Sequence, residues 1–394
     1  MQFSQNGYSV AEGVVALTVT VLRSGIAAPE VTVDYATDDG GTPAVFVPCS
    51  STTGLALDRC DYTKALGTLR FAMGEREKTF QVLISDDSYA EGSETAQLKL
   101  SNPTGGAQLG KHAAAVMTIT DDSPESAGNP IDDATEFVTQ HYHDFLNREP
   151  DAEGLAFWVG GITGCGANAG CREVKRIDTS AAFFLSIEFQ NTGYLVERTY
   201  KTAFGDATSP GVPGTVPIVR LDEFLRDTQR IGRDVIVNQG DWEARLAANK
   251  GAYALEFIQR QRFQATFPAS MTAAEFVGKL DENAGGVLSA DERAQLTALL
   301  APDPPDPSRR AAVLRQVAED QTLVERERNR AFVLMQYFGY LRRNPDDAPE
   351  QNLDFAGWRF WLSKLEEFGG DYRRAEMVKA FLDSDEYRRR FGQQ

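Results

Sequence analysis

The stretch TFQVLISDDSYAEGSETAQLKL, residues 79–100, decides how the first part of this chain folds. Both of its ends alternate apolar and polar side chains, which is the period of a β-strand with one buried face. The ten residues between them, SDDSYAEGSE (85–94), hold four acidic side chains: Asp86, Asp87, Glu91 and Glu94. So much like charge directly after a buried strand requires a physical explanation.

The same alternation recurs through the first 122 residues. Six runs show it, at 14–23, 31–37, 67–73, 79–84, 95–101 and 115–120. Gly, Asp, Asn and Pro separate these runs and indicate turns. Six or seven short strands with Gly-rich turns predict an antiparallel, immunoglobulin-like β-sandwich over residues 1–124.

From residue 134 the apolar spacing becomes helical. In ATEFVTQHYHDFLNR the apolar side chains lie on one helical stripe: Phe137, Val138, Tyr142, Phe145 and Leu146. Residues 125–133 are predicted to be a linker, because Ser, Gly, Asn and Pro dominate there. Two Pro-rich breaks divide the all-α region that follows into three segments: 134–208, 218–300 and 308–394. The fold class is therefore multidomain, β then α.

An internal repeat links the first and last helical segments. Three pairs of stretches match in register: 137–151 with 332–346, 154–158 with 357–361, and 184–189 with 382–387. The matches predict one helical fold used twice, as copy 1 over 134–208 and copy 2 over 308–394.

Four cysteines form two local pairs, Cys49 with Cys60 and Cys165 with Cys171. Neither pair has CxxC spacing, and the chain has only three His, which argues against zinc. Disulfides are favoured over free thiols, and they indicate an oxidising compartment. We therefore expect a secreted or cell-surface protein. Because MQFSQNGYS lacks the features of a signal peptide, the leader would be absent from this sequence.

Charge and motifs exclude several classes of function. The net charge of −17 argues against nucleic acid as a partner, since phosphate binding needs clustered Lys and Arg. No apolar run is long enough to predict a membrane span. The chain has no GxSxG, no P-loop, no GxGxxG after a strand and no evident His-centred triad, so we expect no enzyme.

Acidic residues also stand at other strand ends. Glu12 precedes the first long strand, Asp61 lies in a loop, and Asp121 and Asp122 close the last strand. Strands that run the same way bring such residues to one pole of a sandwich. Unit charges about 4 Å apart repel by roughly 4 kcal/mol at an effective dielectric of about 20. Since Ca²⁺ takes 6–8 oxygen ligands, the pattern predicts a calcium site.

The motifs at 1–123 resemble the Calx-beta domain, the calcium-binding sandwich of sodium–calcium exchangers and many bacterial surface proteins. The resemblance is carried by YSVAEG, TDDG, CDY, GTLRFAMGE, the opening loop, LSNPTGGAQLG and TITDDS, in that order. It implies these ligands: Glu12, Asp61, Asp86, Asp87, Glu91, Glu94, Asp121, Asp122 and the carbonyl of Tyr89. Ser88 and Ser123 stand where the strongest binders have Asp, so the resemblance implies fewer or weaker sites. The alternative is a sandwich that only keeps the shape.

The helical part resembles a bacterial helical domain of unknown function that has been compared with phycobilisome linker domains. FVTQHYHDFLNREPDAEGLAFW, FLSIEF and their second copies carry this resemblance, which covers much of 134–394. It implies no catalytic residue.

Three smaller features have competing interpretations. The stretch Asp281–Glu292 resembles an EF-hand loop, but a capping box formed by Ser289 and Glu292 is favoured. His141 and His143, two apart on a helix, cannot share a metal and are expected at the surface or its boundary. The run at 388–390 is predicted to be a solvated helix end, or a surface that docks onto the acidic pole of a neighbour.

Together these features predict an exported, calcium-binding structural or adhesive protein. We expect a subunit of an extracellular filament or surface assembly, a homo-oligomer or self-assembling polymer, in which Ca²⁺ rigidifies the pole and the interdomain joint. Three alternatives remain open: a surface module that binds polysaccharide or a host ligand, an enzyme hidden in the helical region, and an intracellular calcium sensor.

Overall fold

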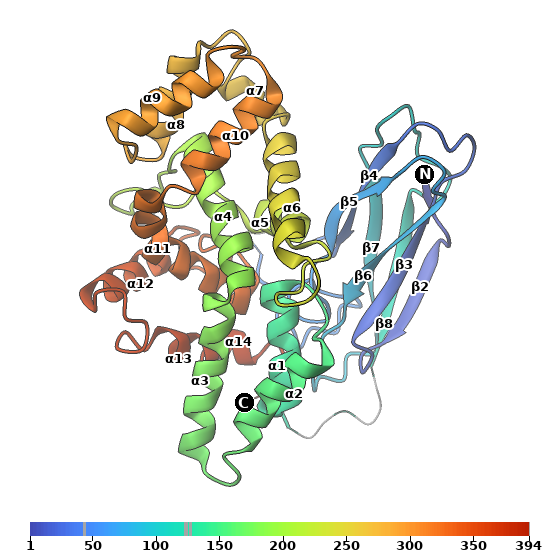
Figure 1. Cartoon of the computed structure of the whole chain (residues 1–394). Helices are drawn as coiled ribbons and strands as arrows, with labels where there is room; N and C mark the ends of the chain where they lie inside the picture. The colour runs from blue at the N-terminus through green and yellow to red at the C-terminus, as the bar shows by residue number, and fades with distance from the viewer. Residues whose placement is uncertain (42–44, 122–124, 126–127, 394) are drawn as a thin grey trace.

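The computed structural model describes residues 1–41, 45–121, 125 and 128–393. Strands occupy the first part of the chain and helices the rest, as the sequence predicts. Figure 1 shows the strands on one side of the molecule and the helical part lying along them.

The strands form two sheets. The smaller sheet has the order β1-β3-β6 and contains Gln2–Phe3, Ala16–Leu22 and Glu77–Leu83. The larger sheet has the order β2-β8-β7-β4-β5 and contains Gly7–Ala11, Ala114–Thr120, Ser93–Ser101, Val31–Asp38 and Leu66–Phe71. Alternate side chains such as Val19, Leu98 and Met117 are fully buried, which is the pattern of a packed sandwich.

The expectation of a wholly antiparallel sandwich is wrong for one pair of strands. β2 lies parallel to β8, with Gly7 opposite Val116 and Ala11 opposite Thr120. The chain leaves the smaller sheet after β1, joins the edge of the larger sheet as β2, and returns to the smaller sheet as β3. Neither β1 nor β2 was predicted, because runs of two and five residues are too short to show a clear period.

Fourteen α-helices follow within the described residues, with one 3₁₀ turn and two π turns. The α-helices are α1 Ala134–His141, α2 Ala152–Thr163, α3 Ala169–Leu185, α4 Ile187–Phe204, α5 Leu221–Gly232, α6 Trp242–Phe257, α7 Gln261–Thr266, α8 Ala273–Asn283, α9 Ala290–Leu300, α10 Pro307–Ala318, α11 Gln321–Gln336, α12 Ala356–Glu367, α13 Met377–Leu382 and α14 Asp385–Arg388. The short turns are η1 Pro130–Asp132, η2 Tyr142–Leu146 and η3 Tyr337–Leu341.

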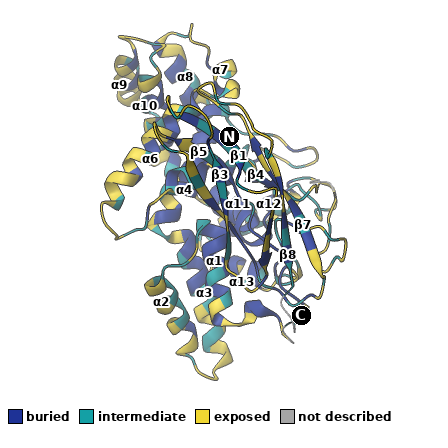
Figure 2. Ribbon diagram, turned by 90° about the vertical axis from the view of Figure 1, so that its right-hand side faces the viewer, coloured by how far each residue is buried: buried dark blue, intermediate teal, exposed yellow. Residues whose placement is uncertain are grey.

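One continuous apolar core joins residues from Ile131 to Phe391. Figure 2 colours most of α4 as buried, because other helices cover it on nearly every side. The predicted division of the helical part into three segments stays a prediction.

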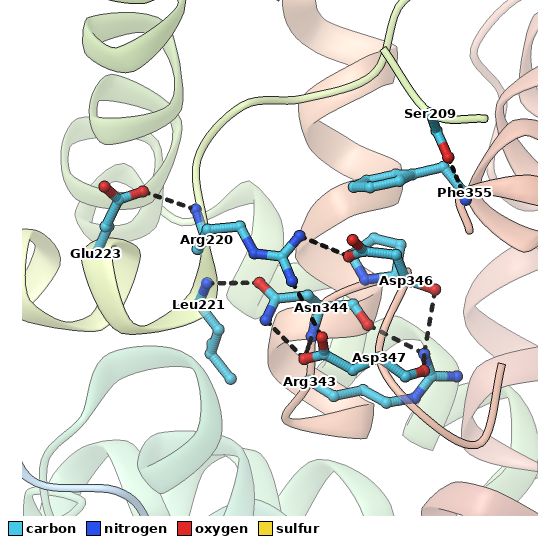
Figure 3. Close-up of polar contacts among 10 residues, drawn as sticks. Ser209, Arg220, Leu221, Glu223, Arg343, Asn344, Asp346, Asp347 and Phe355 are labelled. Atoms are coloured by element: carbon cyan, nitrogen blue, oxygen red, sulfur yellow. Dashed lines mark hydrogen bonds and ion pairs between the residues drawn. The ribbon is translucent and has the colours of Figure 1, made fainter. Parts of the chain in front are cut away.

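Polar contacts tie the break between α4 and α5 to the segment before α12. Arg220 donates hydrogen bonds to Asp346 Oδ1 (2.6 Å) and Asp347 Oδ1 (3.0 Å). The amide of Leu221 donates to Asn344 Oδ1 at 2.8 Å, as Figure 3 shows. Stretches more than 120 residues apart in sequence are thereby held together.

The sandwich and the helices also contact each other directly. α5 packs against β5, and Arg233 donates to the carbonyl oxygen of Thr68 at 2.8 Å. Gln81 of β6 donates to Glu149 at 2.7 Å. In the region predicted as a linker, Pro130 and Ile131 are buried in the helical core. The joint is therefore a packed interface in the part of the chain that the structure describes.

The expectation that both histidines lie near the surface is wrong, because His141 and His143 are each 1% exposed. His141 lies at the end of α1, where Nδ1 contacts the Phe137 carbonyl and Nε2 contacts Ser180 Oγ, each at 2.7 Å. Residues distant in sequence, such as Ser180 of α3 and Tyr340 of η3, contact His141, and the sequence pattern of one helix does not reveal them.

The capping box at Ser289 is confirmed. Ser289 Oγ accepts from the amide of Glu292, and Glu292 accepts from the amide of Ser289 at 2.8 Å. Asp281 accepts from the amide of Leu288 at 2.9 Å and pairs with Arg293. These carboxylates are engaged in ordinary helix-end contacts.

Both predicted disulfides are present. Cys49–Cys60 has a Cα–Cα distance of 5.5 Å, and Cys165–Cys171 has one of 5.6 Å. The first disulfide packs against Tyr89 of the acidic loop.

Candidate metal centre

Strand pairing brings the acidic residues to one end of the sandwich, here called the acidic pole. Because β2 and β8 are parallel and in register, Glu12 and Asp121 leave the sheet at the same edge. The amide of Glu12 continues the pairing by donating to the Thr120 carbonyl at 3.0 Å. The amide of Ser85, just after β6, donates to the Asp61 carbonyl at 3.0 Å. Four separate segments therefore converge at the pole.

Two groups of oxygens at the pole have the spacing of a metal site. Glu12, Asp121 and Glu125 form the connector cluster, in which one oxygen of each lies within 4.8 Å of the others. Asp61, Asp87 and Glu91 form the loop cluster with the same spacing. Ca²⁺–oxygen distances of about 2.3–2.6 Å place two ligands of one ion at up to about 5 Å from each other, so both clusters fit this ion.

The carboxylates of the pole are buried more deeply than acidic side chains usually are. The exposed fractions are 1% for Asp87, 3% for Asp61, 4% for Glu94 and 5% for Glu12. Among the described residues, one oxygen each of Asp87, Glu91 and Glu94 is buried and accepts no hydrogen bond. A buried acceptor without a donor costs free energy, so each of these oxygens calls for a proton or a cation.

Backbone amides hold several of these carboxylates in place. Asp121 Oδ2 accepts from the amides of Glu91 and Gly92, both at 2.8 Å. Asp87 Oδ1 accepts from the amide of Tyr89 at 2.7 Å, while Asp87 Oδ2 accepts nothing. Asp61 Oδ2 accepts from the amide of Leu57. The loop is thus shaped by its own backbone, and oxygens remain for another ligand.

Burial and mutual repulsion raise the pKa values of the pole. Burial, followed by the charges of Asp87 and Asp86, raises the pKa of Glu12 to about 10. Burial is also the largest cause that raises the pKa of Asp87 to about 8 and that of Glu91 to about 9. The pKa of Asp61 is raised well above its usual value by burial and by Glu94. Without a cation, the folded pole therefore favours protonated carboxyls near neutral pH.

The sequence-predicted ligands are distributed as follows. Glu12 and Asp121 lie in the connector cluster, and Asp61, Asp87 and Glu91 in the loop cluster. Glu94 is close enough to raise the pKa of Asp61, and Asp86 is close enough to raise that of Glu12. The hydroxyl of Tyr89 donates to the Arg389 carbonyl at 3.3 Å. Asp122 lies outside the described residues, and the role of all nine as ligands stays a prediction.

Sequence reasoning missed Glu125, because it was assigned to the linker. The only signal available was an acidic residue four positions after Asp121. No local pattern indicates that it lies close to Glu12.

The run at 388–390 is not a solvated helix end. Arg390 is 2% exposed and donates to both carboxylate oxygens of Asp144, at 2.8 and 3.0 Å. Arg388 donates to both oxygens of Asp132 at 2.9 and 3.0 Å. Only Arg389 remains exposed. Two of the three arginines therefore dock within their own chain, Arg390 on the buried Asp144 and Arg388 on the exposed Asp132.

Fold and site together define a two-part protein with a Calx-beta sandwich in front of a helical region. The family profile described as Calx-beta domain matches residues 1–123. The profile described as Domain of unknown function (DUF4214) matches residues 125–193. A Calx-beta domain is therefore followed by a DUF4214 domain.

Particular relatives match short parts of the chain. Adhesion G-protein coupled receptor V1 of Danio rerio is 43% identical over 59 residues, covering 15% of this chain and 1% of that protein. FRAS1-related extracellular matrix protein 2 of Homo sapiens is 34% identical over 125 residues, covering 31% and 4%. Sodium/calcium exchanger Calx of Drosophila melanogaster is 29% identical over 122 residues, covering 31% and 11%. The chain thus spans only a small part of the length of these relatives.

Solved structures match the same region. The apo-form Calx CBD1 domain has 27% sequence identity and a TM-score of 0.27, covering 31% of this chain and 96% of that one. The calcium binding domain CBD12 of CALX1.1 has 28% identity and a TM-score of 0.26, covering 31% and 45%. In the helical part that the structure describes, we find no helix with the length and apolarity needed to cross a bilayer.

Proposed function

We propose that the acidic pole binds Ca²⁺ and that the ion stiffens the joint between the sandwich and the helical part. The observation that carries this proposal is the set of buried oxygens of Asp87, Glu91 and Glu94 that accept no hydrogen bond. Hard oxygen ligands in a loop of this kind suit Ca²⁺ better than Mg²⁺, which demands a strict octahedron and keeps its waters. The match of the sandwich to a sodium/calcium exchanger supports the same ion.

Thermal unfolding of the full chain with and without calcium tests the proposal. A ligand at about 100 times its Kd stabilises the folded state by roughly 2.7 kcal/mol. We expect the melting temperature to rise in CaCl₂ and much less in MgCl₂. Glu91→Gln should reduce the calcium-induced rise, whereas the matched control Glu77→Gln changes an exposed residue of β6 and should not. A wild-type melting temperature that ignores calcium and chelator alike would refute calcium binding.

We further propose that the protein is exported and has a structural or adhesive role, as a subunit of a filament or surface assembly. Two disulfides support an oxidising compartment. The names of two relatives, an adhesion receptor and an extracellular matrix protein, support the same setting. Analytical ultracentrifugation in calcium at low salt tests assembly, and a strictly monomeric chain at high concentration would argue against it. The absence of enzymatic activity stays a prediction.

We also propose that residues 308–394 hold a second copy of the helical fold. In each copy a helix runs into a π turn, η2 or η3, which ends in a left-handed residue. In each copy, the arginine that follows this residue forms a bidentate ion pair with a glutamate distant in sequence: Arg148 with Glu188, and Arg343 with Glu386. Arg148→Lys and Arg343→Lys should lower stability by similar amounts. If one were neutral while the other unfolded the chain, the equivalence would fail.

A further inference from the structure

The segment Arg388–Gly392, which ends the helical part, lies against the acidic loop of the sandwich. The amide of Ser88 donates to the Phe391 carbonyl at 3.1 Å. The hydroxyl of Tyr89 donates to the Arg389 carbonyl at 3.3 Å. Ser88 and Tyr89 sit between Asp87 and Glu91 in the chain, so the docked segment holds the middle of the loop that supplies both of these acids.

The other side of the segment is fixed to the helical part and to its connection with the sandwich. Asn129 Nδ2 donates to the carbonyls of Arg388 at 3.0 Å and of Gly392 at 3.3 Å. Arg390 is anchored by Asp144 and donates to the Arg59 carbonyl, inside the disulfide-closed loop, at 2.6 Å. The segment therefore connects the helical core with two loops of the sandwich.

Gly392 makes the approach to the loop possible. A Cβ at this position would lie 2.2 Å from Ser88 Oγ and 3.4 Å from the Asn129 backbone. Its φ of +154° is also rarely adopted by residues with side chains. The Ser88 hydroxyl can rotate away from such a Cβ, but the strain of a side chain at this φ remains, so a substitution at position 392 would disturb the segment where it meets the loop.

We infer that the segment Arg388–Gly392 positions the acidic loop, residues 85–94. The calcium affinity of the sandwich would then depend on the docked helical part. The inference rests on the proposed calcium binding. A loop that is already ordered by the segment loses less conformational freedom when the ion binds. By linkage, calcium must in turn favour docking of the segment by the same factor, typically about 5–150-fold.

Calcium titration of the full chain by calorimetry tests the inference. Asn129→Ala removes two side-chain hydrogen bonds to the segment, and Gly392→Ala strains the backbone of the segment where it meets Ser88. We expect each to weaken calcium binding about 5-fold or more. Two matched controls should stay within about twofold of wild type. Asn249→Ala also removes two bonds to backbone carbonyls, and Gly106→Ala also places an alanine at a positive φ, +80°, with no atom within 4 Å of its Cβ.

Amide exchange gives a second readout, because the Ser88 amide is itself a donor to the segment. Its exchange should slow on adding calcium to wild type, and less so in the variants. If Asn129→Ala does not fold, the calcium affinity of Gly392→Ala, a substitution near the end of the described chain, still tests the inference. Unchanged affinity in a folded variant whose Ser88 amide exchanges freely would overturn the inference and leave calcium binding intact. A wild type that binds no calcium would instead refute the proposed function, and this inference with it.

Discussion

Without calcium, the protein should lose stability as the pH rises from 5 to 7, and calcium should reverse the loss. Asp87 carries the argument, because burial raises its pKa from 3.8 in the unfolded chain to about 8 in the folded one. A carboxyl with a raised pKa binds its proton more tightly in the folded state. Its stabilising contribution is complete below the unfolded pKa and is lost as the pH rises toward the folded pKa.

The magnitude follows from one proton. Between pH 5 and 7 the folded state keeps the proton on Asp87 and the unfolded state has lost it, which costs about 1.4 kcal/mol per pH unit. Two units amount to about 2.7 kcal/mol, or roughly 10 °C in the melting temperature of the sandwich, residues 1–123, when it unfolds as its own unit. Glu12, with a pKa of about 10, adds to the loss in the same direction.

Melting curves by circular dichroism at several pH values, in excess chelator and in CaCl₂, provide the assay. Calcium replaces the protons, so its apparent affinity should rise with pH, and calorimetry in buffers of different ionisation enthalpy should detect proton release. Asp87→Asn should flatten the pH dependence in chelator. Burial lowers the pKa of His141 and His143 to about 4, and these groups act in the opposite direction, so the decisive quantity is the difference between wild type and Asp87→Asn. An identical pH dependence of the two in chelator would show that the pole is not buried as described.

Three further outcomes are expected. Replacing Cys49 and Cys60 with Ala should cost about 3 kcal/mol through loop entropy. It should also weaken calcium binding, because the disulfide packs on the acidic loop; loss of the second disulfide should affect stability alone. Asp144→Asn leaves Arg390 buried without a charged partner and should cost about 3–5 kcal/mol, measured by urea unfolding. Ser289→Ala should cost about 1 kcal/mol and leave calcium binding unchanged, and any fall in calcium stoichiometry would revive the EF-hand alternative.

The period of the apolar residues was sufficient to predict most of the fold. Strands such as β3 and β7 carry a clear alternation, and their bounds lie within two residues of those predicted. β2 was not predicted, because five residues are too few to define a period. β2 pairs with β8 in parallel because the chain crosses from the smaller sheet to the larger one and back. The local sequence does not indicate this crossing.

The candidate site could be predicted from the sequence to a similar extent. Acidic residues that follow strands running the same way meet at one pole of a sandwich, so the crowded pole could be anticipated. Partners that are distant in sequence could not. Arg390 resembles any cationic helix end until Asp144, 246 residues earlier, is placed beside it. Glu125 lies beside Glu12, which is more than 110 positions earlier in the sequence, and no local pattern indicates that contact.

The parallel pairing of β2 and β8 has a mechanical consequence. β1 and β2 begin the sandwich and β8 ends it, so tension along the polypeptide pulls the neighbours β2 and β8 in opposite directions. The five residue pairs between Gly7 and Ala11 then carry the load together, in shear, and are not peeled apart one by one. A domain built in this way resists stretching. The strand pair that bears the force ends at Ala11 and Thr120, directly before Glu12 and Asp121 of the acidic pole.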